Sequence, residues 1–163
     1  MVKSLKNNFI MEANFNFIKS RVFETNNDWS GPIVRFTIGL ILLPHGAQKM
    51  LGLFGGYGFI GTMNFLTDTK GLPWIIALLV IIIEFIGPFF LMVGLATRLW
   101  AISIIVHMIG IIFASHVEYG FFMNWFGNQQ GEGYEYHLLI IALALVTLLN
   151  GSGKLSLDRL LTK

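Results

Sequence analysis

Four long apolar segments restrict the folds open to this chain more than any other feature of its sequence. They cover residues 33–53, 73–93, 99–115 and 136–149. A membrane-spanning helix needs roughly 20 mostly apolar residues, so each segment is a candidate span, and the short fourth one has the least certain ends. We therefore expect an all-α, polytopic membrane protein built as a bundle of four transmembrane helices.

The charge content favours the lipid bilayer as the surroundings of the chain. Only 12% of the 163 residues are charged and 55% are hydrophobic, whereas soluble domains carry about 25% charged residues. A soluble chain of this composition would leave much apolar surface in water. The sequence has no cysteine, which excludes an iron–sulfur cluster with thiolate ligands. The basic residues form no stripe, so nucleic acid is not an expected partner.

The positions of Lys and Arg predict the orientation in the membrane. Basic residues precede the first apolar segment and follow the fourth, and Arg98 lies in the short connection between the second and third. The loop of residues 116–135 has no Lys or Arg, and that of residues 52–72 has only Lys70. Because basic loops stay in the cytoplasm, both termini are predicted there. Residues 1–30 lack a continuous apolar run, so the first span is expected to direct insertion without a signal peptide.

The first 30 residues have a helical pattern of their own. Apolar residues recur at helical spacing, at Met11, Phe15, Ile18 and Val22. This pattern favours an amphipathic helix in the cytoplasmic interface of the membrane. A segment that contacts a partner subunit, or a disordered segment, is the alternative. We divide the chain into this interfacial segment (1–30), a membrane domain (31–151) and a short cytoplasmic tail (152–163), which we expect to form a surface helix.

Gly56, Gly58 and Gly61 form a G-x-G-x-x-G pattern similar to a dinucleotide-binding fingerprint. That fingerprint requires a preceding strand and a following helix that faces the pyrophosphate, whereas this one follows a candidate membrane helix. We therefore interpret the glycines as turn residues and expect a short helix over residues 59–66.

Ionisable residues inside the apolar segments are the strongest functional signal. A charge at the bilayer centre costs about 2.5–3.5 kcal/mol on insertion scales, so it normally faces the bundle interior and has a partner. Glu84 is expected about 18 Å below the outer face, and His107 about 12 Å above the inner face of a roughly 30 Å core. These depths coincide. Because residues 94–97 form a tight connection between the two helices, we expect Glu84 and His107 to face each other.

A second polar group lies toward the outer end of the first segment. His45, Gln48 and Lys49 share one helix face, about one turn above the level of Glu84. Lys49 reaches either down to Glu84 or up to the headgroups. Acidic, histidine and aromatic residues also gather at the outer ends of the third and fourth segments, namely His116, Glu118, Trp125, Glu132, Tyr134, Glu135, Tyr136 and His137. Their clustering predicts the mouth of a pocket.

Each of these residues also has a structural interpretation. For Glu84 the alternative to binding or proton handling is a role in fixing helix register, and for Arg35 and Lys49 it is anchoring of helix ends at the membrane surface. The aromatic residues are typical of the belt at a membrane interface.

Six short motifs follow one another along the chain. They are Arg35-Phe-Thr-Ile-Gly39, His45-Gly46-x-Gln-Lys49, Glu84-x-x-Gly87, Gly94-Leu-x-Thr-Arg98, Gly133-Tyr-Glu135 and Gly153-x-Leu-Ser-x-Asp158. Their order and spacing resemble those of the DoxX family of small four-helix membrane proteins. The resemblance implies a four-helix bundle in the bacterial cytoplasmic (inner) membrane. It marks Arg35, His45, Lys49, Glu84, Arg98 and Glu135, which overlap the polar residues found above.

The resemblance also implies a link to oxidoreductases. Some family members are linked to thiosulfate:quinone oxidoreductase, and others to membrane oxidoreductase or oxidative-stress complexes. The chain has no cysteine to carry a sulfur intermediate, which argues against thiosulfate chemistry by this chain alone. The first hypothesis is therefore a quinone-linked subunit that takes its electrons from other proteins. Its candidate pocket is His45, Gln48, Lys49, Glu84 and His107, with Arg35, Arg98, His116, Glu135 and His137 as motif and rim residues.

The alternative hypothesis is a non-catalytic accessory subunit of a larger membrane complex. A non-covalently bound quinone is the expected cofactor, and lipid and partner subunits are the expected partners. Haem is disfavoured because only His116 and His137 are expected at one depth, and no metal site is expected. A small transporter is disfavoured because no inverted repeat is evident.

Overall fold

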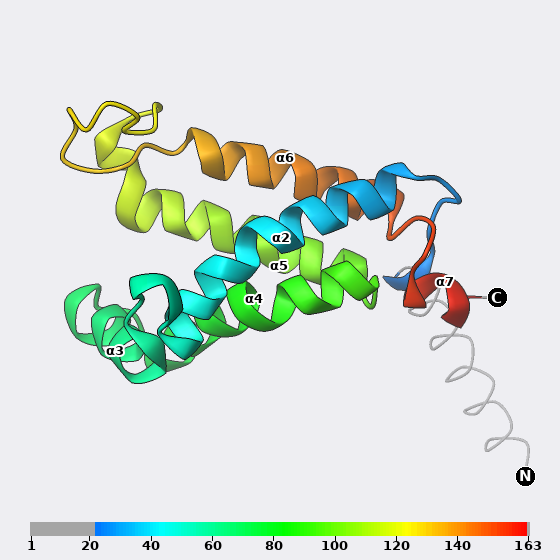
Figure 1. Cartoon of the computed structure of the whole chain (residues 1–163), viewed down its shortest axis with the longest axis horizontal. Helices are drawn as coiled ribbons and strands as arrows, with labels where there is room; N and C mark the ends of the chain where they lie inside the picture. The colour runs from blue at the N-terminus through cyan, green and yellow to red at the C-terminus, as the bar shows by residue number, and fades with distance from the viewer. Residues whose placement is uncertain (1–21, 163) are drawn as a thin grey trace, which may run out of the picture.

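The computed structural model describes residues 22–162 and is helical, without strands, over that range. Its four long helices are α2 (Ser30–Leu51), α4 (Trp74–Val93), α5 (Thr97–Ile111) and α6 (Glu135–Asn150). They run along the length of the molecule and pack against one another (Figure 1). The all-α prediction is confirmed for these residues, and each long helix coincides with one apolar segment. The predicted amphipathic helix of residues 1–30 falls mainly on residues 1–21, which lie outside the described residues.

The connections divide the bundle into two different ends (Figure 1). We call one the loop end, because it carries the segment between α2 and α4, with the short helix α3 (Gly58–Asn64), and the long loop between α5 and α6. The other is the tail end, which carries the α4–α5 turn and the last helix, α7 (Leu157–Leu161). Helix α3 agrees with the short helix predicted over residues 59–66.

Local sequence explains where the long helices end. Gly52 after α2 (φ 73°) and Gly94 after α4 (φ 69°) adopt the left-handed conformation that commonly ends a helix and that glycine adopts without strain. Helix α5 does not stop at Ile111. It continues through a π-helical turn (Ile112–His116) and a 3₁₀ turn (Val117–Tyr119), which carry it out to the loop end.

Two helices among the described residues are long and apolar enough to cross a membrane, Trp74–Val93 and Thr97–Tyr119. Helix α6 is apolar but has 16 residues, and α2 is long enough but contains Arg35, Gln48 and Lys49. Large apolar side chains are exposed on the outer faces of all four long helices, whereas Arg35, Glu84 and Asp158 are buried. Apolar outer faces on every long helix, together with fully buried charged side chains, are unusual for a soluble bundle.

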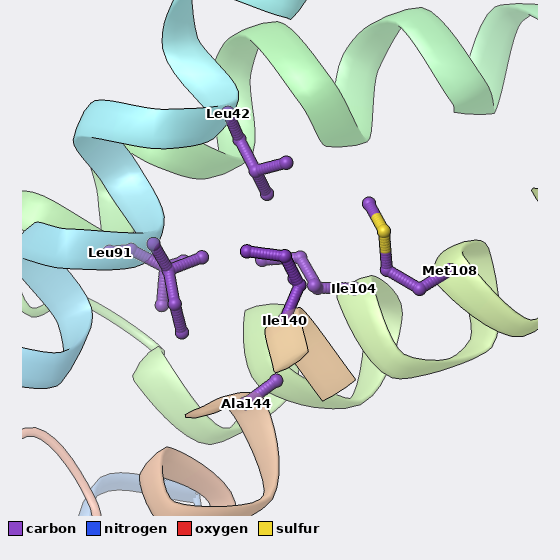
Figure 2. Close-up of a cluster of buried hydrophobic side chains, with 7 residues drawn as sticks. Leu42, Leu91, Ile104, Met108, Ile140 and Ala144 are labelled. Carbon is purple, nitrogen blue, oxygen red and sulfur yellow. The ribbon is translucent and has the colours of Figure 1, made fainter. Parts of the chain in front are cut away.

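One apolar cluster fills the centre of the bundle. Its fully or almost fully buried members are Ile38, Leu42, Leu91, Ile104, Met108, Ile140 and Ala144. They come from all four long helices, and Figure 2 shows their side chains converging between the ribbons. Leu42 and Met108 also line a cavity toward the loop end. The core is therefore the floor of that cavity.

Candidate functional site

A buried carboxylate with two basic partners lies at the centre of the site. Glu84 of α4 is only 3% exposed. One of its oxygens, Oε1, lies 2.7 Å from Nε2 of His107 on α5, and the other, Oε2, accepts a hydrogen bond of 2.5 Å from Nζ of Lys49 on α2. The expected contact between Glu84 and His107 is thus confirmed. Lys49 points toward Glu84 and not toward the headgroups. Three helices are joined through one side chain.

The close approach of α2 and α4 positions Glu84 opposite Lys49. Gly46 of α2 lies directly against the backbone of Glu84 and Phe85, and a Cβ atom there would overlap their main-chain atoms. One turn after Glu84, Pro88 has no N–H to donate to the Glu84 carbonyl, so this carbonyl lacks the usual helical hydrogen bond. Gly46 therefore sets the distance between the two helices at the level of the carboxylate.

The carboxylate faces a cavity of about 270 Å³ at the loop end, lined by both polar and apolar side chains. Predicted site residues in its wall are His45, Lys49, Glu84, His116 and His137. The other lining residues are Leu42, Met108, Ile111, Met123, Glu132 and Tyr136. Met123 and Glu132 come from the α5–α6 loop, so this loop covers part of the cavity. The polar residues predicted from four separate segments share one space.

All four histidines of the chain belong to this region. His45, His116 and His137 line the cavity, and His107 lies behind Glu84 as its hydrogen-bond partner. The rings of His116 and His137 have centroids 4.3 Å apart, as expected for two residues at the same depth. Within residues 22–162, no group of three or more His, Asp or Glu side chains has the geometry to hold a metal ion.

Two predicted residues near the cavity shape the loops and do not line it. Gln48 donates a hydrogen bond of 3.2 Å from Nε2 to the Phe54 carbonyl, in the turn that follows α2. Oε1 of Glu135 accepts hydrogen bonds from the Met123 N–H (3.0 Å) and from Nε1 of Trp125 (3.1 Å). Glu135 therefore holds the loop that carries Met123 into the cavity wall.

Arg35 lies at the opposite end of the bundle and is fully buried, at 0% exposure. Its guanidinium donates only to main-chain carbonyls, namely those of Leu91, Met92, Ser152, Lys154 and Leu155. Two of these, Leu91 and Met92, lie in the last turn of α4, where a cation is favourable. The expectation of a surface anchor is wrong for Arg35, because the tail folds back over it.

Asp158 of α7 completes this arrangement at the tail end. Its carboxylate accepts hydrogen bonds from the N–H groups of Ala96 (2.6 Å) and Thr97 (3.0 Å), at the start of α5. Ala96 has a left-handed backbone (φ 51°), which is strained for a residue other than glycine. The tail is a surface helix only in part, because Asp158 and Ser152 are buried. Arg98 contributes one long hydrogen bond, 3.4 Å from its NH2 group to the Leu149 carbonyl, and lies far from the cavity.

The site prediction did not name Gly46, which supports the cavity, or the lining residues Leu42, Met108, Ile111, Met123, Glu132 and Tyr136. Gly46 stands in the motif with His45 and Lys49, and a small residue beside polar ones in a membrane helix is a signal of close packing. Glu132 and Tyr136 were expected at the mouth of the pocket but were not separated there from ordinary interface residues.

Comparison with known proteins points to one family. The family model of DoxX matches residues 32–117. A protein of Bacillus subtilis (strain 168) named "Putative oxidoreductase CatD" is 31% identical over 126 residues, which cover 77% of this chain and 82% of that protein. A protein of Haemophilus influenzae, described as uncharacterized, is 32% identical over 80 residues, or 49% of each chain. No solved structure matches the chain significantly.

Proposed function

The chain belongs to the DoxX family, and on that premise we propose that it is a four-span membrane protein whose cavity binds the ring of a quinone. In this proposal it is the membrane subunit of an oxidoreductase, and its electrons come from a redox subunit bound to it. The name of the Bacillus subtilis relative supports an oxidoreductase. The observation that carries the proposal is the buried Glu84 carboxylate, held by Lys49 and His107 in the wall of a cavity lined by both polar and apolar side chains.

In the proposed orientation, the tail end faces the cytoplasm and the loop end faces the opposite side of the inner membrane. Arg98, Lys154 and Arg159 lie at the tail end, whereas the α5–α6 loop has no Lys or Arg. The 16 residues of α6 span about 24 Å at 1.5 Å per residue, less than the roughly 30 Å of a bilayer core. Local thinning of the bilayer accommodates a helix of this length.

A purely structural role does not explain well why Glu84, Lys49 and His107 form a buried polar cluster. Replacement of a buried ion pair by apolar residues is often neutral or stabilising, so stability alone does not require such a pair. A general acid or base, in contrast, must be held dry and close to its partner. The short contacts of Glu84 with His107 and Lys49 provide such a group.

The dimensions and donors of the cavity fit a quinone ring. Its volume of about 270 Å³ is just below the roughly 300–1,000 Å³ of pockets for drug-sized ligands, which suits a small ring whose apolar tail lies outside. A bound quinone supplies the two-electron, two-proton redox chemistry. Lys49 and His45 can donate hydrogen bonds to a ring oxygen, and the Glu84–His107 pair can hold a proton. Leu42, Met108 and Ile111 provide apolar contact with the ring.

Quinone titration of the purified chain in lipid nanodiscs tests this proposal. We expect wild-type protein to bind a short-chain quinone, and Glu84→Gln and His107→Leu to weaken the binding by roughly tenfold or more, since each removes a charge-assisted contact of about 1.5–3 kcal/mol. Glu118→Gln is the matched control, because Glu118 is exposed and does not line the cavity. Equal affinities in all four proteins would falsify the quinone site.

The accessory-subunit hypothesis remains the second candidate, favoured by the exposed aromatic tip of the α5–α6 loop. Trp125 and Phe126 are 79% and 88% exposed there, and large aromatic side chains are enriched in protein interfaces. A chain that binds no quinone but is retained by a partner complex, and is released by Trp125→Ala with Phe126→Ala, would support this function instead.

A further inference from the structure

The wall of the cavity toward the loop end holds a pair of histidines that the quinone contacts do not use. His137 of α6 is 6% exposed, and its ring lies beside that of His116, with centroids 4.3 Å apart. His116 is in turn 2.7 Å from the main-chain carbonyl of Glu132, through Nδ1. Both rings and Glu132 line the same cavity as Glu84.

These contacts determine which nitrogen of His116 can take up a proton. A carbonyl oxygen only accepts hydrogen bonds, so Nδ1 of His116 carries the hydrogen of that bond. In the neutral ring, Nε2 is then the free acceptor. In His137, Nδ1 is buried and has no hydrogen-bond partner among the described residues. No hydrogen bond from the described residues therefore occupies Nε2 of His116 or either ring nitrogen of His137.

Exposure decreases step by step along this row of groups. Glu132 is exposed, His116 is partly buried, and His137 and Glu84 are buried. The π-helical turn Ile112–His116 brings His116 from the end of α5 to the face opposite His137, and such turns occur often at functional sites. The groups thus extend from water at the loop end to the carboxylate inside the bundle.

We propose that His116 and His137 form a proton relay between the aqueous surface at Glu132 and the Glu84–His107 pair. The relay rests on the proposed function, because a cavity needs a proton supply only if its ligand exchanges protons. Histidine suits the role because its ring can bind a proton at one nitrogen and release it again without any change in its heavy-atom bonds.

The relay needs only the transfer of one proton at a time. Nε2 of His116 binds a proton from surface water and gives it to His137, directly or through one water molecule. His137 passes it through water in the cavity to the Glu84 carboxylate or to His107, and both relay rings return to the neutral form. No electron is transferred and no bond between heavy atoms changes. The other titratable groups that surround this path are His45 and Lys49 on α2, Tyr136 on α6 and Glu132 in the loop.

His45 offers the competing route. It is exposed on α2 and lines the cavity, with its ring centroid 6.2 Å from that of Tyr136. The ring beside it is the phenol of Tyr136, and among the described residues no second imidazole stands beside His45 as His137 stands beside His116. A test of the relay must therefore compare these two entrances.

The experiment uses the full chain with ¹⁵N-labelled histidine in lipid nanodiscs, without quinone. The four ring signals are assigned from single variants, and the exchange of the His107 ring proton with water is measured by NMR. We expect His116→Phe and His137→Phe to slow this exchange by roughly tenfold or more, as for loss of a positioned proton-transfer group. His45→Phe should leave it unchanged. Because no quinone is present, the outcome is independent of whether the cavity binds one.

A variant that keeps polarity separates the relay from mere hydration of the wall. His137→Gln can bind water but cannot take up a proton at neutral pH, so it should slow the exchange as much as His137→Phe does. An unshifted His107 signal shows that the contact with Glu84 is intact in each variant. The relay is wrong if the exchange is normal in His137→Gln, or if it slows in His45→Phe and not in the His116 and His137 variants.

Discussion

Two clusters of buried charge lie at opposite ends of the same bundle, and they are neutralised in different ways. At the tail end, Arg35 and Asp158 bind backbone groups, at helix termini and in the tail. At the loop end, the charges of Glu84 and Lys49 bind each other, and Glu84 also binds His107. A charge that binds backbone completes the fold, whereas charges that bind one another beside a cavity remain available to a ligand. The first cluster is therefore structural and the second is the candidate site.

The largest effect on stability is expected from loss of the tail-end cluster. Arg35→Leu removes the side-chain donor to the carbonyls of Met92, Ser152, Lys154 and Leu155, and leaves Leu91 with only its bond from the Gly94 N–H. We expect the free energy of unfolding to fall by about 3–5 kcal/mol, as when one partner of a buried charged network is removed. Thermal unfolding in detergent measures it. Arg98→Ala is the control, since Arg98 makes one long hydrogen bond, and an equal loss in both variants would show that the Arg35 contacts are unimportant.

A smaller loss is expected where α2 crosses α4. The Cβ of Gly46→Ala would overlap the backbone of Glu84 and Phe85, and overpacking of this kind typically costs about 1–3 kcal/mol. Gly110→Ala is the matched control, because the space around Gly110 is open. Unfolding midpoints of the two variants provide the comparison. We also expect weaker quinone binding in Gly46→Ala alone, because the helix that carries Glu84 must move; a Gly46→Ala protein with wild-type stability and affinity would contradict the close crossing.

The smallest effect on stability is expected from complete replacement of the loop-end cluster. A triple variant with Lys49→Met, Glu84→Met and His107→Leu removes all three polar partners together and leaves none unpaired. We expect its free energy of unfolding to stay within about 1 kcal/mol of wild type or to rise, as for other buried ion pairs replaced by apolar residues, while quinone binding is lost. A strong destabilisation would assign the cluster a structural role like that of Arg35, and the distinction between the two ends would fail.

The two ends also differ in how well the sequence predicts them. The Glu84–His107 contact follows from depth arithmetic, since a rise of 1.5 Å per residue fixes where each side chain lies along its helix. The direction of Lys49 does not follow, because its long side chain reaches both Glu84 and the headgroups from the same backbone position. The position of His116 depends on a π-helical turn that the apolar pattern of residues 112–116 does not reveal.

The contacts of Arg35 and Asp158 cannot be predicted from the sequence, for a different reason. A basic residue near the end of a membrane helix is typical of an anchor at the headgroups, and nothing local shows that the tail will cover it. The hydrogen bonds of Arg35 to Ser152 and Leu155 connect residues 117 and 120 positions apart. Contacts of this kind depend on how the whole chain packs. The motifs that contain Arg35 and Asp158 can be recognised in the sequence, but the contact between the two regions cannot be predicted from it.

The burial of Arg35 by the tail has a consequence for the order of events during synthesis. Arg35 lies in α2, but its partner Leu155 is made 120 residues later, which takes roughly 6–24 s at about 5–20 residues per second. Until then the guanidinium lacks the carbonyls of Ser152, Lys154 and Leu155. The tail end of the bundle can therefore close only after these residues have been made, and a chain truncated before residue 152 would leave Arg35 with the carbonyls of Leu91 and Met92 alone.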